Sequence, residues 1–214
     1  MRQNKDISKT VFVYNKLKQM IITGDFSGNH KWSLRTLAEK FKLSMAPVNV
    51  AVRQLENEGL LTVSPQKGIS IKQFSIPQIK EANIIREALE IQAIRLITLK
   101  NDAAIIDSLH KIACKITKAF KISMKKYYLL DHEFHLQIIR KSELNLLIQE
   151  YEKFSTICMI SSEFLGFDYF GNNPKNKDSH IQVVKAIKSG NPDNAEKVLR
   201  KHIGSDASRQ PLKS

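Results

Sequence analysis

The chain has 214 residues, enough for one large domain or two small ones, and its 42% of apolar residues excludes a disordered protein, yet no apolar run approaches the roughly 18 to 20 residues of a membrane span. The charged start lacks the apolar core of a signal peptide, and Cys114 and Cys158 are too few and too distant for a disulfide framework or a zinc finger, so we expect a cytoplasmic protein with reduced cysteines. A net charge of +13 favours a polyanionic partner, such as nucleic acid or an anionic membrane surface, although a lysine-rich composition can also reflect genome bias alone.

The start of the chain predicts two helices. Apolar residues at helical spacing cover residues 8–23, and a segment rich in Gly, Asp and Ser ends that pattern. Ser33 is then placed to cap a second, short helix, and a tight turn over residues 42–44 follows it.

A third helix and a β-hairpin come next. Ser44 is the expected N-cap, Pro47 lies in the first turn, where a missing N–H costs little, and Gly59 stands where the helix would end. Residues 60–74 alternate apolar and polar side chains around a turn that contains Gly68, which is typical of a hairpin. This order of elements predicts a winged helix-turn-helix, whose third helix enters the major groove of DNA while the hairpin tip approaches the neighbouring groove.

From Pro77 onward the pattern is helical throughout. We expect helices near residues 77–99, 102–122, 125–140, 143–165, 176–189 and 192–204, with a loop over 166–177 and a polar tail from Gly204. Asn191 is the expected cap of the last helix. The fold class is therefore mainly α, with a winged helix-turn-helix over residues 1–74, a hinge near 73–78, and an all-α helical bundle over 75–214.

Four side chains in the second half have the types and positions of metal ligands. Asp131 and His135 are four residues apart on a predicted helix, so both face the same side, which makes half of a metal site. His180 lies near the start of a later helix and His202 near the end of the last one. Each histidine alone is more often an ordinary surface or core residue, but the set of four at these positions favours a shared site.

Several short residue patterns occur at fixed distances from one another within residues 33–71. They are Leu37-Ala38-Glu39, Leu43-Ser44, Pro47-Val48, Arg53-Gln54-Leu55-Glu56, Glu58-Gly59-Leu60 and the turn glycine Gly68. With these features, residues 11–72 resemble the DNA-binding domain of GntR-type bacterial regulators. The resemblance implies that the DNA contacts come from Arg35, Ser44, Met45, Ala46, Asn49, Arg53, Lys67 and Gly68.

Two of these positions depart from the family pattern. GntR-type proteins usually have arginines where this chain has Met45 and Asn49. A methionine cannot form charge-assisted bonds, whereas an asparagine can still pair with adenine. The operator sequence is therefore free to differ from the family norm. The alternative for Arg35, Asn49 and Lys67 is that they are ordinary solvated surface residues.

Three stretches of the second half carry a further resemblance. IREALEIQAIRLI, DHEFHLQIIRKSELN and SHIQVVKAIKSGNPDNAEKVLRKHI resemble segments of the FCD ligand-sensing domain, found in the FadR branch of the GntR family. The resemblance covers roughly residues 77–204. In metal-binding members the ligands are one aspartate and three histidines, and the matching positions hold Asp131, His135, His180 and His202.

This resemblance implies a divalent metal ion and a small organic ligand. Three imidazoles and a carboxylate suit zinc first, and also nickel, iron or manganese. A site with a net charge of +1 would attract a small carboxylate, which Arg86 could hold bidentately and which Asn145, at a family asparagine position, would also contact. For Arg86 the alternative is an ion pair with Glu90, one turn later on the same helix.

The sequence thus predicts a bacterial DNA-binding transcription regulator that is not an enzyme. The resemblance implies a homodimer on near-palindromic operator DNA, with repression the commoner sign, and no membrane partner. In this hypothesis a small organic acid bound at the metal changes the affinity for the operator. Two alternatives stay open: a metal-dependent hydrolase or lyase, and a nucleic-acid-binding protein without a sensed ligand.

Overall fold

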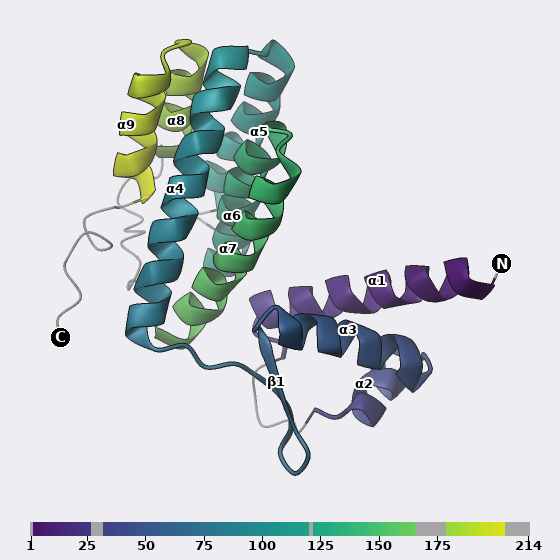
Figure 1. The fold of residues 1–214 in the computed structure, drawn as a ribbon. Coiled ribbons are helices and arrows are strands. Elements are labelled where there is room, and N and C mark those ends of the chain that lie inside the picture. The colour runs from purple at the N-terminus through teal and green to yellow at the C-terminus, as the bar shows by residue number, and fades with distance from the viewer. Residues whose placement is uncertain (1, 27–31, 120–121, 166–178, 204–214) are drawn as a thin grey trace. The chain divides into compact units, whose positions relative to one another are not determined.

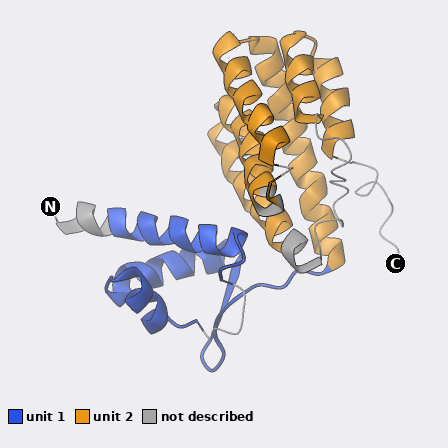
Figure 2. Cartoon of the chain, turned by 180° about the vertical axis from the view of Figure 1, so that it is seen from behind, with its two compact units in different colours: residues 1–75 blue, residues 76–214 orange. Residues whose placement is uncertain are grey.

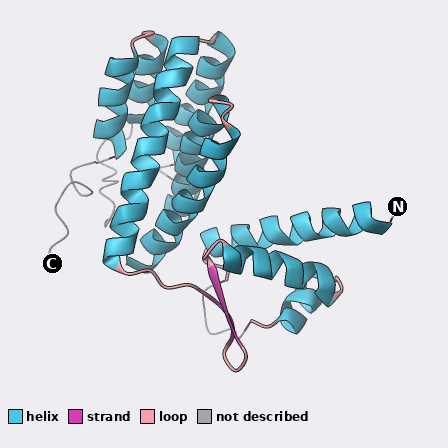
Figure 3. Ribbon diagram, viewed as in Figure 1, coloured by secondary structure: helices cyan, strands magenta, loops and turns pink. Residues whose placement is uncertain are grey.

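The computed structural model describes residues 2–26, 32–119, 122–165 and 179–203, which fall into two compact units, residues 1–75 and 76–214 (Figure 2). Nearly all of the regular structure is helical, and one two-stranded sheet lies in the first unit (Figure 3). The mainly α fold class is therefore confirmed. The loop expected over residues 166–177 and the tail expected from Gly204 lie outside the described residues.

The first unit contains three helices and a hairpin. Its elements are α1 (Arg2–Ile22), α2 (Leu34–Phe41), α3 (Met45–Asn57), β1 (Leu61–Ser64) and β2 (Gly68–Ile71). The order agrees with the winged helix-turn-helix predicted from the sequence. The expected start of the first helix at residue 8 was wrong, because α1 begins at Arg2. No glycine or proline interrupts residues 2–8, so the backbone can continue in helical geometry without an apolar stripe to reveal it.

Local hydrogen bonds fix the ends of α2 and α3. The Ser33 hydroxyl accepts a hydrogen bond from the backbone N–H of Thr36 at 3.1 Å, as expected for an N-cap. Lys42 ends α2 in the left-handed conformation, with φ of 54°. Ser44 does stand at the N-cap position of α3, but its side chain makes no capping hydrogen bond. The exposed hydroxyl of Ser44 therefore makes no hydrogen bond to the start of α3.

The hairpin pairs β1 with β2 in antiparallel register, from Leu61 opposite Ile71 to Ser64 opposite Gly68. Gly68 has a φ of 81°, which favours glycine at the end of this turn. Trp32 adds a single bridge to β2, because the backbone N–H of Ile69 donates to the Trp32 carbonyl at 2.8 Å. A bridge of one residue has no periodic pattern in the sequence, so it was not predicted.

The second unit is a bundle of six helices within its described part. They are α4 (Ile76–Lys100), α5 (Ala103–Ala119), α6 (Met124–Lys141), α7 (Asn145–Leu165), α8 (Ser179–Lys188) and α9 (Pro192–Ile203). The α4 helix packs against α6, α7, α8 and α9, and Figure 1 shows α8 and α9 beside it. Fully buried side chains from several helices form the core, among them Ile94, Leu109, Phe134 and Ile187. Across the described ranges, none of the helices has a stretch long and apolar enough to cross a bilayer.

Candidate metal centre

The four side chains that the sequence singled out come together inside the second unit. Asp131 and His135 lie one turn apart on α6, His180 is on α8 and His202 is on α9. Each offers one ligand atom, and these atoms all lie within 4.8 Å of one another. The fold therefore gathers a carboxylate oxygen and three imidazole nitrogens from three helices at one point.

The ligand atoms contact one another directly. The Nε2 atom of His180 donates to Asp131 Oδ1 at 2.8 Å, and the Nε2 atoms of His135 and His202 lie 3.1 Å apart. The rings of His180 and His202 meet edge to face, with their centroids 4.3 Å apart. Two nitrogens that face each other at this distance can share only one proton, so one Nε2 of the His135–His202 pair offers a lone pair.

Glu90 on α4 orients one of the imidazoles. The Nδ1 atom of His135 donates to Glu90 Oε2 at 2.6 Å, and Glu90 is fully buried. Because the proton sits on Nδ1, the Nε2 atom of His135 presents its lone pair to the centre. A carboxylate behind a ligating histidine is a recurrent support in metal sites. From the sequence, Glu90 was expected to contact Arg86, and its role behind His135 was not predicted because the two residues lie 45 positions apart.

Arg86 forms an ion pair with Glu90, which was the alternative to a contact with a bound carboxylate. Its Nε lies 3.1 Å from Glu90 Oε1, and 19% of its side chain is exposed. The guanidinium therefore stands behind the ligands on the same carboxylate as His135. Asn145 is the exposed first residue of α7, and within the described part of the chain no contact joins it to the four ligands.

The environment sets the charge of each ligand. Burial opposes the charge of Asp131, but the hydrogen bond from His180 and the field of His135 outweigh it and hold the Asp131 pKa well below its usual range. Burial, followed by His180 and His135, holds the His202 pKa well below its ordinary value. Burial would also lower the pKa of His135, yet Glu90 outweighs burial and raises it. An ionised aspartate and a neutral His202 are the forms that bind metals, whereas the protonated form of His135 that Glu90 favours must release a proton when an ion binds.

The donor set fits a divalent metal ion. Ligand atoms about 2.1 Å from a zinc ion lie roughly 3 to 4 Å from one another, so small side-chain shifts from the present spacing would complete a coordination shell. The Nδ1 atom of His202 is buried and has no hydrogen-bond partner in the described structure. The protein alone thus leaves this cluster of polar groups incompletely satisfied, as a site built for an ion would be.

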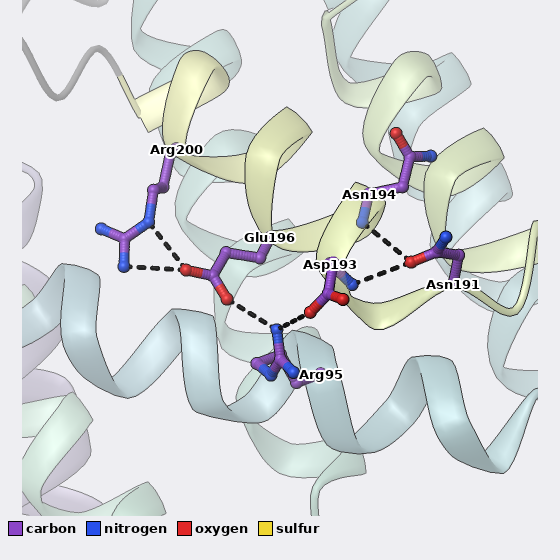
Figure 4. A network of polar contacts seen from close by, with 6 residues as sticks. All are labelled: Arg95, Asn191, Asp193, Asn194, Glu196 and Arg200. Atoms are coloured by element: carbon purple, nitrogen blue, oxygen red, sulfur yellow. Dashed lines mark hydrogen bonds and ion pairs between the residues drawn. The ribbon is translucent and has the colours of Figure 1, made fainter.

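A network of ion pairs holds α9, which carries His202, against α4 (Figure 4). Arg95 Nη1 on α4 contacts Asp193 at 2.7 Å and Glu196 at 2.8 Å. Arg200 contacts Glu196 at 3.0 Å and reaches Glu87 on α4 at 2.6 Å. Several linked pairs resist loss better than one exposed pair. The network ends two residues before His202, so it fixes the backbone from which that ligand projects.

The start of α9 is capped as expected. The side-chain oxygen of Asn191 accepts hydrogen bonds from the backbone N–H groups of Asp193 and Asn194, at 3.0 and 3.1 Å (Figure 4). Pro192 occupies the first helical position. The Gly190-Asn191-Pro192 sequence therefore sets where α9 begins, and with it the register that brings His202 to the other ligands.

The reactivity of the Cys158 thiol is a measure of how tightly α7 is packed. It is buried on α7, and burial raises the pKa of its thiol to about 11, whereas Cys114 on α5 is half-buried. At pH 8 only about one Cys158 in a thousand would be a thiolate, the form that reacts. We expect iodoacetamide to modify Cys114 in the native protein and to spare Cys158, as followed by peptide mass spectrometry. Unfolding in guanidinium should make both react, and equal native rates would contradict this packing of α7.

The residues predicted to contact DNA lie on the exposed surface of the first unit. Four of them lie on the exposed side of α3, namely Met45, Ala46, Asn49 and Arg53, and Ser44 is the exposed N-cap of that helix. Arg35 is on α2, Lys67 is in the hairpin turn, and Gly68 is the half-buried first residue of β2. Arg35 forms an exposed ion pair with Glu39 at 3.1 Å, and Arg53 pairs with Glu56 at 2.7 Å. The fold thus leaves these groups accessible to a partner.

Comparison with known proteins agrees with both halves of this description. Residues 9–71 match the family described as bacterial regulatory proteins, gntR family, and residues 82–205 match the FCD domain. YdhC of Bacillus subtilis, described as an uncharacterized HTH-type transcriptional regulator, is 26% identical over 200 residues, 90% of this chain and 87% of that protein. The HTH-type transcriptional repressor RspR of Escherichia coli is 21% identical over 196 residues, 89% of this chain and 84% of that protein.

Solved structures share the fold. The structure of E. coli McbR/YncC superposes with a TM-score of 0.78 at 22% identity, over 92% of this chain and 94% of that one. A GntR regulator from Rhodococcus sp. RHA1 gives a TM-score of 0.77 at 16% identity, over 94% and 97%. Since both the DNA-binding and the FCD segments match in order, the chain belongs to the GntR family of bacterial regulatory proteins, with a C-terminal FCD domain.

Proposed function

We propose that the protein is a transcription repressor whose affinity for operator DNA is controlled by a small carboxylate bound at a metal ion in the FCD domain. The observation that carries the proposal is the convergence of Asp131, His135, His180 and His202 within 4.8 Å in the unit that follows the winged helix-turn-helix. Repression is the proposed sign because the relatives RspR and GlaR of E. coli are named repressors.

The metal ion would supply positive charge and open coordination positions. A divalent ion held by one carboxylate and three neutral imidazoles leaves a net charge of +1, and the Arg86–Glu90 pair adds none. Zinc is the first candidate for this donor set, and nickel, iron or manganese also suit it. Arg86 keeps guanidinium N–H groups beyond the one beside Glu90, and these would hold a carboxylate of the ligand.

Control of DNA binding requires two states of a dimer. A ligand changes operator affinity only if it binds more tightly to one arrangement of the two DNA-binding units than to the other. We propose a homodimer whose two α3 helices meet half-sites of a near-palindromic operator. Residues 73–78 would be the hinge; they begin after the end of β2 and run into the first turn of α4, which starts at Ile76.

An enzymatic role has less support. A metal-dependent hydrolase or lyase needs a general base beside an open metal position. Asp131 is itself one of the four ligands, and Glu90 is already committed to His135 and Arg86. The family of this chain consists of regulators. The four converging ligands likewise favour a sensing regulator over a protein that only binds nucleic acid.

The test of the proposed function is operator affinity measured with and without candidate ligands. Full-length protein is loaded with zinc, and fluorescence anisotropy follows binding to a duplex selected by the protein from random DNA. One carboxylate in a panel of small organic acids should weaken binding about 5- to 150-fold, the usual range of allosteric coupling. An unchanged affinity with every acid would show that the site is structural only.

Arg86→Lys is the variant that isolates the carboxylate contact. It keeps the charge beside Glu90 but loses the planar fork that binds a carboxylate bidentately. We expect normal zinc content, normal DNA affinity and a ligand response at least about tenfold less sensitive. The matched control is Arg140→Lys, since Arg140 is exposed at the end of α6 and pairs with Glu152 instead. An identical shift in both variants would remove Arg86 from the ligand site.

A further inference from the structure

The exposed face of α3 is unusual for a helix that reads DNA, because its first turns carry no charge. Met45 and Val50 are 56% and 55% exposed, and Ala46 and Asn49 are exposed between them. The opposite face, with Pro47, Val48, Ala51 and Val52, is buried in the unit. The residues that project outward at the start of α3 are therefore two apolar side chains, one methyl group and one amide.

The single cation of α3 is held by its own helix. Arg53 Nη1 lies 2.7 Å from Glu56 Oε2, and Glu56 Oε1 in turn accepts a hydrogen bond from the backbone N–H of Val63 at 3.2 Å. Glu56 is thus fixed between α3 and β1, and it draws the guanidinium toward itself. The other cations of the unit lie outside α3, among them Arg35 on α2, Lys42 in the turn that precedes α3, and Lys67 at the hairpin turn. Cations at those places are suited to contact DNA phosphates. Such contacts orient a protein on the duplex but do not distinguish one base sequence from another.

Each base pair demands particular groups in the major groove. Guanine is read through two donors aimed at its O6 and N7 atoms, usually from arginine or lysine, and cytosine through an acceptor for its N4 amino group, usually from a carboxylate. The first turns of α3 have neither the paired donors nor a carboxylate, and the single hydroxyl of Ser44 at the N-cap does not distinguish one base from another. Adenine is read by the amide of asparagine, which donates to N7 and accepts from N6, and the thymine methyl is read by apolar contact.

We infer that the first turns of α3 recognise A·T base pairs, with Asn49 paired to an adenine and Met45 and Val50 against thymine methyl groups. The inference rests on the proposed binding of operator DNA and names the bases at the centre of each half-site. Thymine methyl groups also explain why two large apolar side chains stay exposed beside the only amide at the start of α3. Sequence is thus read by contacts that need no charge, while cations elsewhere in the unit supply affinity.

The experiment is a selection of random duplex DNA by the full-length, zinc-loaded protein, followed by anisotropy on the selected site. We expect A·T pairs at the positions contacted by α3. Replacing the critical adenine with 7-deazaadenine, which lacks the N7 acceptor, should weaken binding about 5- to 150-fold. Replacing thymine with uracil, which lacks the methyl group, should weaken wild-type binding several-fold and should leave the Met45→Ala, Val50→Ala double variant unaffected.

Substitutions of two asparagines on α3 separate an effect on base recognition from an effect on folding. Asn49→Ala should abolish the preference for adenine at one position, and Asn49→Arg should move that preference to guanine. Asn57→Ala is the matched control, because Asn57 is exposed on the same helix two turns later and is expected to leave the selected site unchanged.

The outcomes distinguish this inference from the function on which it rests. A selected half-site with guanine under α3, kept by Asn49→Ala, overturns the reading of A·T pairs while leaving operator binding intact. If the selection enriches no sequence at all, operator recognition itself is overturned. Enrichment of A·T pairs with full sensitivity to 7-deazaadenine and uracil supports both.

Discussion

Replacing His202 with alanine is expected to abolish metal binding while leaving the metal-free protein folded. His202 is one of the four proposed ligands, and losing a ligand should weaken metal affinity by more than the 10- to 100-fold loss that follows from removing a supporting residue. In the metal-free protein its Nδ1 atom is buried and has no partner among the described residues, while its Nε2 atom lies 3.1 Å from His135 Nε2. The substitution loses that contact but also removes the unsatisfied nitrogen, so we expect the metal-free free energy of unfolding to change by about 1 kcal/mol or less.

His180→Ala should differ from His202→Ala in the metal-free state. His180 is buried and donates to the Asp131 carboxylate, whose side chain is 15% exposed. Without that donor the carboxylate loses its partner, which costs about 1 to 3 kcal/mol. Both variants should lose the metal, but only His180→Ala should destabilise the metal-free protein clearly.

Metal analysis and thermal unfolding measure these effects together. Wild-type protein should carry about one zinc per chain, and should gain about 2.7 kcal/mol at a free zinc concentration 100 times the dissociation constant and about 4.1 kcal/mol at 1,000 times. Neither variant should gain stability from zinc. His110→Ala is the matched control, because His110 is an exposed histidine of α5 outside the cluster. Zinc retained by either ligand variant would show that the ion binds elsewhere.

The sequence predicted the four clustered side chains better than it predicted the residues that support them. Asp131 and His135 were identified because helical periodicity places residues i and i+4 on one face. His180 and His202 were singled out by their places near the ends of predicted helices, and the resemblance to the FCD domain added support for a shared site, since spacing alone does not say that α8 and α9 meet α6. Caps such as Ser33 and Asn191 were predictable because their hydrogen bonds reach only two or three residues along the chain.

Long-range partners were beyond the reach of sequence patterns. Glu90 is invisible as a support for His135 because the two lie 45 residues apart and meet only after α4 and α6 pack together. The link from Arg200 to Glu87 spans 113 residues. A charged residue on a helix is more often solvated than buried, so the buried Glu87 and Glu90 would both be placed at the surface by composition alone.

Glu90→Gln is expected to lower both stability and metal affinity, through two different neighbours. Glu90 is fully buried, lies 3.1 Å from Arg86 Nε and accepts from His135 Nδ1 at 2.6 Å. Glutamine keeps the shape but loses the charge, so the guanidinium of Arg86 is left uncompensated. Breaking a buried ion pair costs about 3 to 5 kcal/mol, and the partial exposure of Arg86 places this variant at or below the lower end. Weaker support for His135 should reduce zinc affinity about 10- to 100-fold.

A double variant separates these two effects. Arg86→Met together with Glu90→Gln removes the uncompensated charge, so the free energy of unfolding should return to within about 1 kcal/mol of wild type, since replacing both partners of a buried pair is often neutral. Zinc affinity should stay low, because His135 still lacks its carboxylate. Chemical denaturation gives the first quantity and competition with a chelator gives the second. If the double variant regained zinc affinity along with stability, Glu90 would act only by balancing Arg86, and its orientation of His135 would be refuted.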